Sequence, residues 1–251
     1  MKRLSRLIYG ITGHLPAARW CLAIAVIAFT AVVSVHKYID MADMAAFSCL
    51  EVMYLILTDT MNIVFIYLPL YLFAVSGIMF DSGFGEIAVL RYESRREWLS
   101  VKLVTYIVNT LVFFGIILLL NFAVSYRVFN LSDVWSGDFI GFRVMAGQSA
   151  SDFSHSPVPT IVAASFAVLM LYVFCGTVNM LFSLITDRES VGLFASLVAG
   201  ILLGIGDMLI VTESFTSQIN RCVVLAVAAV LVCVVANSAA LKKDFGGKKM
   251  Y

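Results

Sequence analysis

The residues with the clearest potential for specific chemistry lie in one charged segment, residues 81–102, between two apolar runs. Arg91 and Arg95 are four residues apart and share a helical face, and Arg96 flanks them. Glu86 is favourable near the start of a helix because an acidic side chain complements the helix dipole there. Guanidinium groups form planar, paired hydrogen bonds with carboxylates. The pattern predicts a short amphipathic helix at 84–98 whose arginines bind acidic groups.

Two interpretations of this helix stay open. Three arginines beside a membrane span attract anionic lipid headgroups, at about 1 kcal/mol each, and this attraction alone can explain them. Alternatively, a short rigid helix between two spans can dock into a groove of a soluble partner and pass the partner's motion to both spans. Trp98, at the end of the helix, is expected at the membrane interface.

The chain lacks the sequence patterns of common catalytic sites. It has no complete phosphate-binding loop, no H-E-x-x-H zinc motif and no G-x-S-x-G nucleophile motif. Its three histidines are scattered, and Asp207 is the one acid within the predicted spans. We therefore expect no catalytic, metal or cofactor site in this chain, and an energy source that lies elsewhere.

Composition predicts an all-α, polytopic membrane protein. Hydrophobic residues make up 61% of the 251 residues and charged residues 13%, and the mean hydropathy is +0.97. A soluble domain has about 45–50% apolar and about 25% charged residues. The balance of 17 Lys and Arg against 16 Asp and Glu argues against a nucleic-acid partner. One transmembrane domain is expected over 1–251.

Six apolar runs are long enough to cross a bilayer, which takes about 20 residues per helix. With the N-terminus in the cytoplasm, twelve Lys and Arg residues fall on the inner side and four on the outer side, with Arg19 at the inner boundary. We therefore expect a multi-pass protein of the cell membrane with both termini cytoplasmic: an interfacial stub at 1–18, an extracellular loop at 125–157 and a tail at 241–251. The predicted spans are Arg19–Val35, Asn62–Phe80, Leu103–Val124, Val158–Ile185, Val191–Val211 and Cys222–Ala240.

The largely apolar stretch Met41–Leu57 can be interpreted in two ways. It can be a seventh span, or a helix lying at the outer interface. Asp40, Asp43 and Glu51 fall at offsets of three and then eight, on one helical face, which favours the interfacial helix. A seventh span would also move the basic C-terminal tail outside. We expect six spans.

Other candidate residues lie within the spans and in the outer loop. Asp207 is a candidate for a substrate pathway, or a hydrated residue near the headgroups. Gly200 and Gly204 belong to a stripe of small residues, with Gly192 and Ser196, for packing within the chain or between subunits. Asn62 ties helices together or lines a pathway. The many aromatic residues of 125–157 predict an ordered cap on the outer membrane surface.

The run from Arg91 to Leu99, RYESRREWL, followed by Lys102, resembles the coupling-helix region of permease subunits of type-2 ABC exporters. It is closest to the small, Gram-positive-style permeases whose ATPase is a separate chain. The resemblance implies a type-2 exporter-like bundle of six spans, in which two permeases, identical or related, pack with two ATPases. ATP and magnesium would bind the ATPase, which would dock at Glu86, Arg91, Arg95 and Arg96.

The same resemblance implies export of a peptide, a lipid-like molecule or a drug-like molecule by alternating access. The alternative that the sequence leaves open is a non-transporting membrane protein, an immunity or sensor subunit that binds a peptide outside the cell.

Overall fold

The computed structural model describes residues 17–40, 47–78, 95–209 and 214–242. At 95, 96, 207–209, 241 and 242 the description is limited to the backbone. Within these ranges every regular element is a helix. The elements are α2 (Ala17–Asp40), α3 (Cys49–Thr58), the π-helix η1 (Met61–Tyr67), α4 (Leu68–Val75), α6 (Arg95–Val128), α7 (Gly137–Met145), the 3-10 helix η2 (Ala150–Phe153), α8 (Pro157–Thr186), α9 (Glu189–Leu209) and α10 (Phe215–Lys242).

Five of the described helices are long and apolar enough to cross a membrane, namely α2, α6, α8, α9 and α10. They run for 21 to 34 residues, and at 1.5 Å per residue each covers the roughly 30 Å of a bilayer core. The pair formed by α3 and the continuous η1–α4 helix makes a sixth span if it is counted as one bent crossing. The expectation of an all-helical protein suited to a membrane is confirmed.

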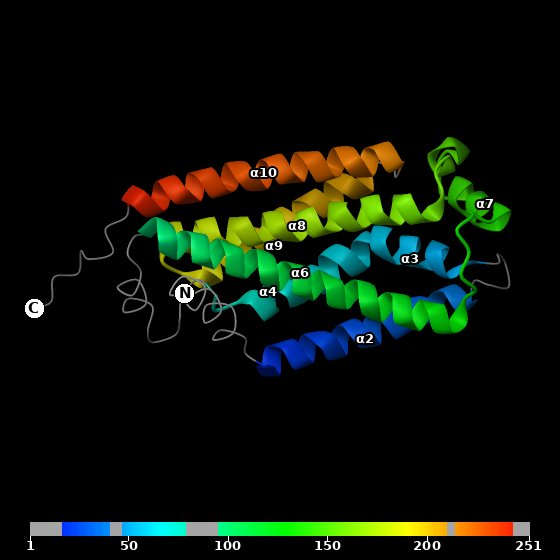
Figure 1. The fold of residues 1–251 in the computed structure, drawn as a ribbon, viewed down its shortest axis with the longest axis horizontal. Coiled ribbons are helices and arrows are strands. Elements are labelled where there is room, and N and C mark those ends of the chain that lie inside the picture. Colours follow the sequence, from blue (N-terminus) through cyan, green and yellow to red (C-terminus); the bar gives the residue numbers. More distant parts are fainter. Residues whose placement is uncertain (1–16, 41–46, 79–94, 210–213, 243–251) are drawn as a thin grey trace, which may run out of the picture.

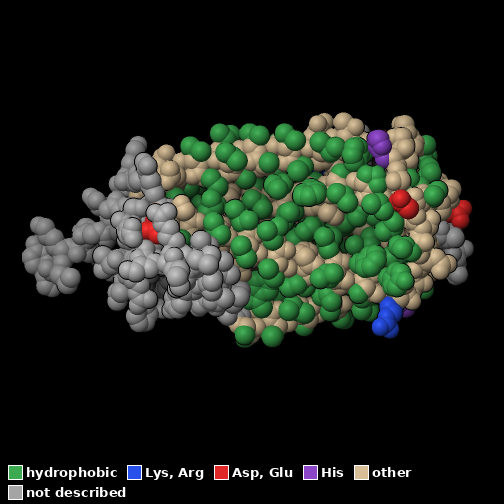
Figure 2. All heavy atoms as spheres, viewed as in Figure 1, with side chains coloured by type: hydrophobic (Ala, Val, Ile, Leu, Met, Phe, Trp, Pro, Cys, Tyr) green, Lys and Arg blue, Asp and Glu red, His purple; other side chains and the backbone are tan. Residues whose placement is uncertain are grey.

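The helices lie side by side as a bundle, and different helix termini gather at its two ends (Figure 1). α2, α6 and α9 begin at the end where α4 and α10 finish, and α7 lies at the opposite end. α8 is the central helix: 61% of its span is buried, against 17% for α10, and it contacts α3, α6, α9 and α10. Hydrophobic side chains cover the length of the bundle on the face shown in Figure 2, as a lipid-facing surface requires.

The structure corrects the expected second span, Asn62–Phe80. The chain instead forms α3, breaks after Thr58, and continues as η1 and α4 with a bend of 59°. We call this break the elbow, residues 58–61. Pro69 at the start of α4 has no N–H and its ring crowds the preceding turn, which gives a physical reason for the change from π to α geometry there.

The expectation of an interfacial helix at Met41–Leu57 is wrong for the described part, because α3 is buried. Glu51, expected on a polar face, is 0% exposed. Its carboxylate accepts hydrogen bonds from the backbone N–H groups of Ser48 (2.6 Å) and Ser136 (2.5 Å). Ser48 in turn caps the helix by accepting from the Glu51 N–H. These bonds stabilise a carboxylate away from water, and charge spacing alone does not reveal them.

The loop after α6 is ordered, as its aromatic content predicts. α7 and η2 fold back on α3, and aromatic rings from these elements form a second hydrophobic core. Trp135 stacks on Phe139 with ring centroids 4.9 Å apart, and its indole N–H donates to the carbonyl of His155 (2.6 Å). We call this unit the aromatic cap: Tyr54, Trp135, Phe139 and Phe153 with Phe47.

We expect the two ends of the bundle to lie on opposite sides of the membrane, with the aromatic cap outside. Cysteines introduced at two exposed positions, Ser151→Cys in η2 and Ser190→Cys in the first turn of α9, test this. A membrane-impermeant maleimide should label the first in intact cells and the second only after permeabilisation, because the basic residues are expected inside. The wild-type chain supplies the background from its own cysteines. Labelling of both variants from one side would contradict the arrangement.

Candidate functional site

The charged segment predicted from the sequence leaves the bundle at the end of α4, where the backbone needs polar partners. The last carbonyls of any helix lack partners within that helix. Here Ser76 is the C-cap, and Gly77 follows with φ +96°, in the left-handed region that glycine adopts at the end of helices. Ile78 is 3% exposed, whereas Ser76 and Gly77 are half-buried, so this chain end is partly shielded from water.

Two cations from neighbouring helices bind the carbonyls at this chain end. Arg19, near the start of α2, donates from Nη1 to the carbonyl oxygen and to the hydroxyl of Ser76, both at 2.6 Å. Lys102 of α6, which is buried, donates from Nζ to the carbonyl of Ile78 at 2.5 Å. Cations are favourable at a helix C-terminus because they complement the negative end of its dipole.

A carboxylate from a third helix binds the remaining backbone donor. Glu189 Oε1 accepts the N–H of Gly77. Glu189 is also the first residue of α9, where an acid complements the positive end of that helix. We call this set the α4 anchor: Arg19, Ser76, Gly77, Ile78, Lys102 and Glu189. It connects the end of α4 to α2, α6 and α9 at once.

Apolar core residues lie beside the anchor. Val75 and Ile78 belong to the main hydrophobic core, and so do Trp98 and Leu99 in the first turns of α6. Trp98 is 3% exposed, so it packs inside the protein, and its position at the depth of the membrane interface stays a prediction. Hydrogen bonds in a low-dielectric surrounding are stronger than in water, so these core residues strengthen the buried part of the anchor, at Ile78 and Lys102.

Of the predicted docking residues, Glu86 and Arg91 lie outside the described residues, as does most of 84–98. Arg95 and Arg96 form the first turn of α6, which runs without a break to Val128, and only their backbone is described. The segment 79–94 therefore starts one residue after Ile78 and ends one turn before Trp98. The residue before this segment, Ile78, belongs to the α4 anchor. The helix after it, α6, carries the anchor residue Lys102.

The glycine stripe of α9 packs within the chain. A Cβ at Gly200 would lie 2.1 Å from Leu68 Cδ2, and one at Gly204 would lie 2.8 Å from Val64 Cγ2. Both distances are shorter than atoms tolerate, so a larger residue at either position would force Leu68 or Val64 to shift. Ser196, from the same stripe, donates to the carbonyl of Cys175 in α8 at 2.8 Å.

Asn62 lies in η1 and joins helices. It is buried, and its Nδ2 donates to Ser34 Oγ of α2 and to Asp59 Oδ2, each at 3.1 Å. Asp207 lies in the last turn of α9, where only its backbone is described. Among the described residues no group of three or more His, Cys, Asp or Glu side chains is arranged to hold a metal ion.

Sequence analysis missed the partners that make up the anchor, although a signal for them exists. Arg19, Lys102 and Glu189 each lie at, or within two residues of, the start of the first, third or fifth predicted span. These three starts share the side of the membrane at which the second span ends. Charged residues at such positions can meet the end of that span, and the structure brings them together there.

We expect loss of the Glu189 carboxylate to destabilise the purified protein. Glu189→Leu removes the acceptor of the Gly77 N–H and should lower the free energy of unfolding by about 1–3 kcal/mol. Glu189→Gln keeps an oxygen acceptor and should have a smaller effect. Thermal unfolding in a non-ionic detergent measures both, with the exposed Asp40→Leu as a matched control. Equal unfolding temperatures for Glu189→Leu and the control would contradict a role for this hydrogen bond.

Comparison with known proteins finds no match to this chain. No protein-family model matches it, and no match is found among curated proteins or among solved structures. Its function has to be inferred from its own residues and their geometry.

Proposed function

We propose that this chain is the permease subunit of an ABC exporter. In this proposal it moves a peptide, a lipid-like molecule or a drug-like molecule outward by alternating access, and a separate subunit hydrolyses ATP. Two permeases, identical or related, pair with two ATPases, and each ATPase docks at the segment that holds Glu86, Arg91, Arg95 and Arg96. ATP and magnesium are bound by the ATPase and not by this chain.

The observation that carries the proposal is the α4 anchor at the root of the arginine-rich segment. A docking element is useful to a transporter only if its displacement moves the membrane helices. Residues 79–94 join two chain ends that are held by charged hydrogen bonds and by core packing. A push on the segment would therefore act on α4 and α6 directly, and on α2 and α9 through Arg19 and Glu189.

The composition of the membrane helices supports the same proposal. In the five long described helices the acids lie only within two residues of a helix end, and the bent second crossing adds Glu51, which caps α3, and Asp59 at the elbow. A proton-driven pump usually needs several ionisable groups along one path. Energy supplied by a partner through a mechanical link suits such a bundle. The arginines at 91, 95 and 96 are suited to carboxylates on that partner because each guanidinium can form a bidentate pair.

We expect reversal of charge in the arginine-rich segment to abolish binding of the ATPase. Arg91→Glu with Arg95→Glu places like charges against acidic partners, so the tagged chain, purified from its own cells, should lose any co-purifying ATPase and its ATP hydrolysis. Arg127→Glu, at the other end of the bundle, is the matched control and should keep both. Retained assembly and hydrolysis in the double variant would contradict docking at this segment.

We expect loss of the Arg19 guanidinium to uncouple transport from ATP hydrolysis. Arg19→Met removes both bonds to Ser76 while it leaves the arginine-rich segment unchanged. The ATPase should still co-purify and hydrolyse ATP, and ATP-dependent substrate movement in membrane vesicles should fall about tenfold or more. Arg127→Met should transport normally. If Arg19→Met transports at the wild-type rate, the anchor does not carry the motion.

A second candidate function is that of a non-transporting immunity or sensor subunit. Apolar side chains on the outside of the aromatic cap favour it, because Val134 and Met145 are 72% and 88% exposed at the expected outer end of the bundle and offer contacts to an extracellular peptide. Vesicle assays separate the two functions. Peptide binding without ATP-dependent accumulation would favour the sensor, and accumulation would favour the exporter.

A further inference from the structure

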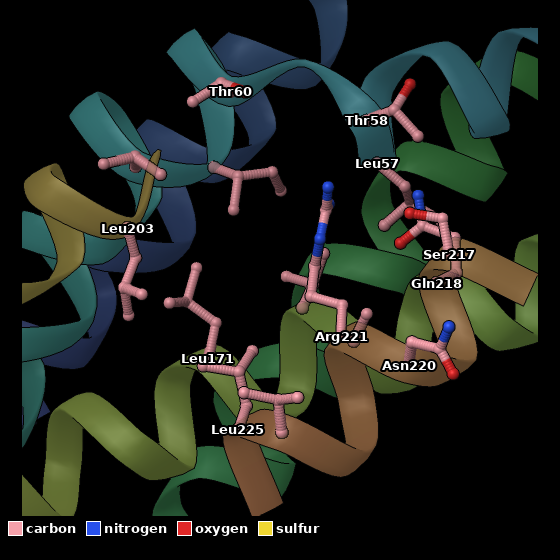
Figure 3. Close-up of a pocket in the computed structure, with 15 residues that line it drawn as sticks. Leu57, Thr58, Thr60, Leu171, Leu203, Ser217, Gln218, Asn220, Arg221 and Leu225 are labelled. Atoms are coloured by element: carbon pink, nitrogen blue, oxygen red, sulfur yellow. The ribbon is translucent and has the colours of Figure 1, made fainter. Parts of the chain in front are cut away.

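A cavity of about 300 Å³ lies beside the elbow, between α3 and η1 on one side and α8, α9 and α10 on the other. This volume is at the lower end of the range for small-molecule sites. Figure 3 shows side chains from these helices converging on it, with Leu171 from α8, Leu203 from α9 and Leu225 from α10. Among the described residues of the lining, none belongs to the α4 anchor, so the cavity is separate from that site.

Hydrocarbon suits the larger part of the cavity wall. Nine of the lining residues are apolar, and they come from all five of the surrounding helices. Val224 lines the cavity and is also 66% exposed on the apolar flank of α10, so the cavity adjoins the surface that faces lipid. The nine residues are Leu57, Ile63, Val64, Ala167, Val168, Leu171, Leu203, Val224 and Leu225.

Gln218 of α10 places a buried amide in this wall. The residue is 2% exposed, and its Nε2 has no hydrogen-bond partner within the described part of the chain. A buried donor without an acceptor is costly, so such a group calls for an explanation. Because Nε2 donates and does not accept, the missing partner is an acceptor atom. Figure 3 shows Gln218 among the side chains around the cavity, so a ligand there can supply that atom.

The expected depth of Gln218 in the membrane indicates which acceptor is at hand. α10 has 28 residues and is about 42 Å long, whereas the hydrocarbon core of a bilayer is about 30 Å thick. A helix centred in the bilayer therefore extends about 6 Å beyond the core at each end. Gln218 lies about 4.5 Å along the axis from the first residue of α10, close to the edge of the core. The acyl chains of membrane lipids begin at this depth with an ester carbonyl, which accepts hydrogen bonds.

We propose that this cavity binds an ester-linked acyl chain of a membrane lipid. The ester carbonyl accepts the hydrogen bond from Gln218 Nε2, and the first part of the chain lies along the apolar wall. Leu225 is about 10 Å further along α10 than Gln218, so the wall becomes apolar in the direction in which the chain runs. Because the chain and its carbonyl are recognised, the head group lies outside the cavity and its charge has no part in binding.

Two lipids that differ in a single carbonyl test this proposal. Monooleoylglycerol carries the ester, and its ether analogue has a CH₂ group in place of the carbonyl, with the same chain and the same uncharged head. The purified full chain in a non-ionic detergent is mixed with equal amounts of both, and native mass spectrometry measures which is bound. The ester should bind with one copy per chain and about fivefold more tightly than the ether, because it forms one more hydrogen bond.

Variants locate the hydrogen bond and the cavity. Gln218→Leu should remove the preference for the ester and leave the affinity for the ether unchanged, because leucine is apolar and similar in size. Asn237→Leu removes an exposed amide near the other end of the same helix, so it is the matched control and should keep the preference. Ala167→Phe adds a ring to a small residue of the wall and should weaken both lipids by filling the space. Thermal unfolding without lipid checks that each variant is folded.

Three results would overturn the proposal. The first is that the ester does not bind to the wild type at one copy per chain. The second is equal affinity of the wild type for ester and ether, which would make water, rather than a lipid carbonyl, the partner of Gln218. The third is a preference for the ester that survives in Gln218→Leu, which would place the lipid elsewhere. Binding is expected whether or not an ATPase pairs with this chain, so this proposal and the proposed exporter function fail separately.

Discussion

The end of α4 depends on one constraint: backbone groups enclosed in an apolar bundle must find polar partners. α4 ends beside core residues, where its carbonyls and the Gly77 N–H are partly shielded from water, and charged side chains from elsewhere in the chain bind them. Arg19, Lys102 and Glu189 provide them. Each comes from a different helix, so satisfying the end of α4 also fixes the positions of α2, α6 and α9 around it. A structural requirement thus produces a mechanical connection at the root of the arginine-rich segment.

The opposite end of the bundle is stabilised differently. There Glu51 is buried with two backbone donors, and aromatic rings of α3, α7 and η2 pack around it. Between the two ends, the elbow and the π-helix break the regular packing of the second crossing. Glycines at 200 and 204 let α9 approach this irregular segment closely. A cavity lies beside the elbow, with α3 and η1 on one side and α8, α9 and α10 on the other.

Much of the architecture follows from hydropathy, since α2, α6, α8, α9 and α10 each contain a long apolar run with few charges. The second crossing was mispredicted because α3 is short and contains Glu51, and an acid in an apolar helix suggests exposure. Only the three-dimensional positions of Ser48 and Ser136 explain its burial. The anchor was partly visible in the charges beside three span starts. The backbone partners of these charges were not visible, because they are the carbonyls of Ser76 and Ile78 and the N–H of Gly77, and every sequence contains such groups.

The most direct test of the anchor is hydrogen–deuterium exchange at the end of α4 in the intact protein. Exchange of the Gly77 amide reports its bond to Glu189, and exchange of neighbouring amides reports whether the end of α4 stays in place. We predict slow exchange at Gly77 and Ile78 in the wild type. Replacing Glu189 by leucine should accelerate exchange at both residues and in the first turn of α9. Exchange that is fast in the wild type, or unchanged by this replacement, would contradict the anchor.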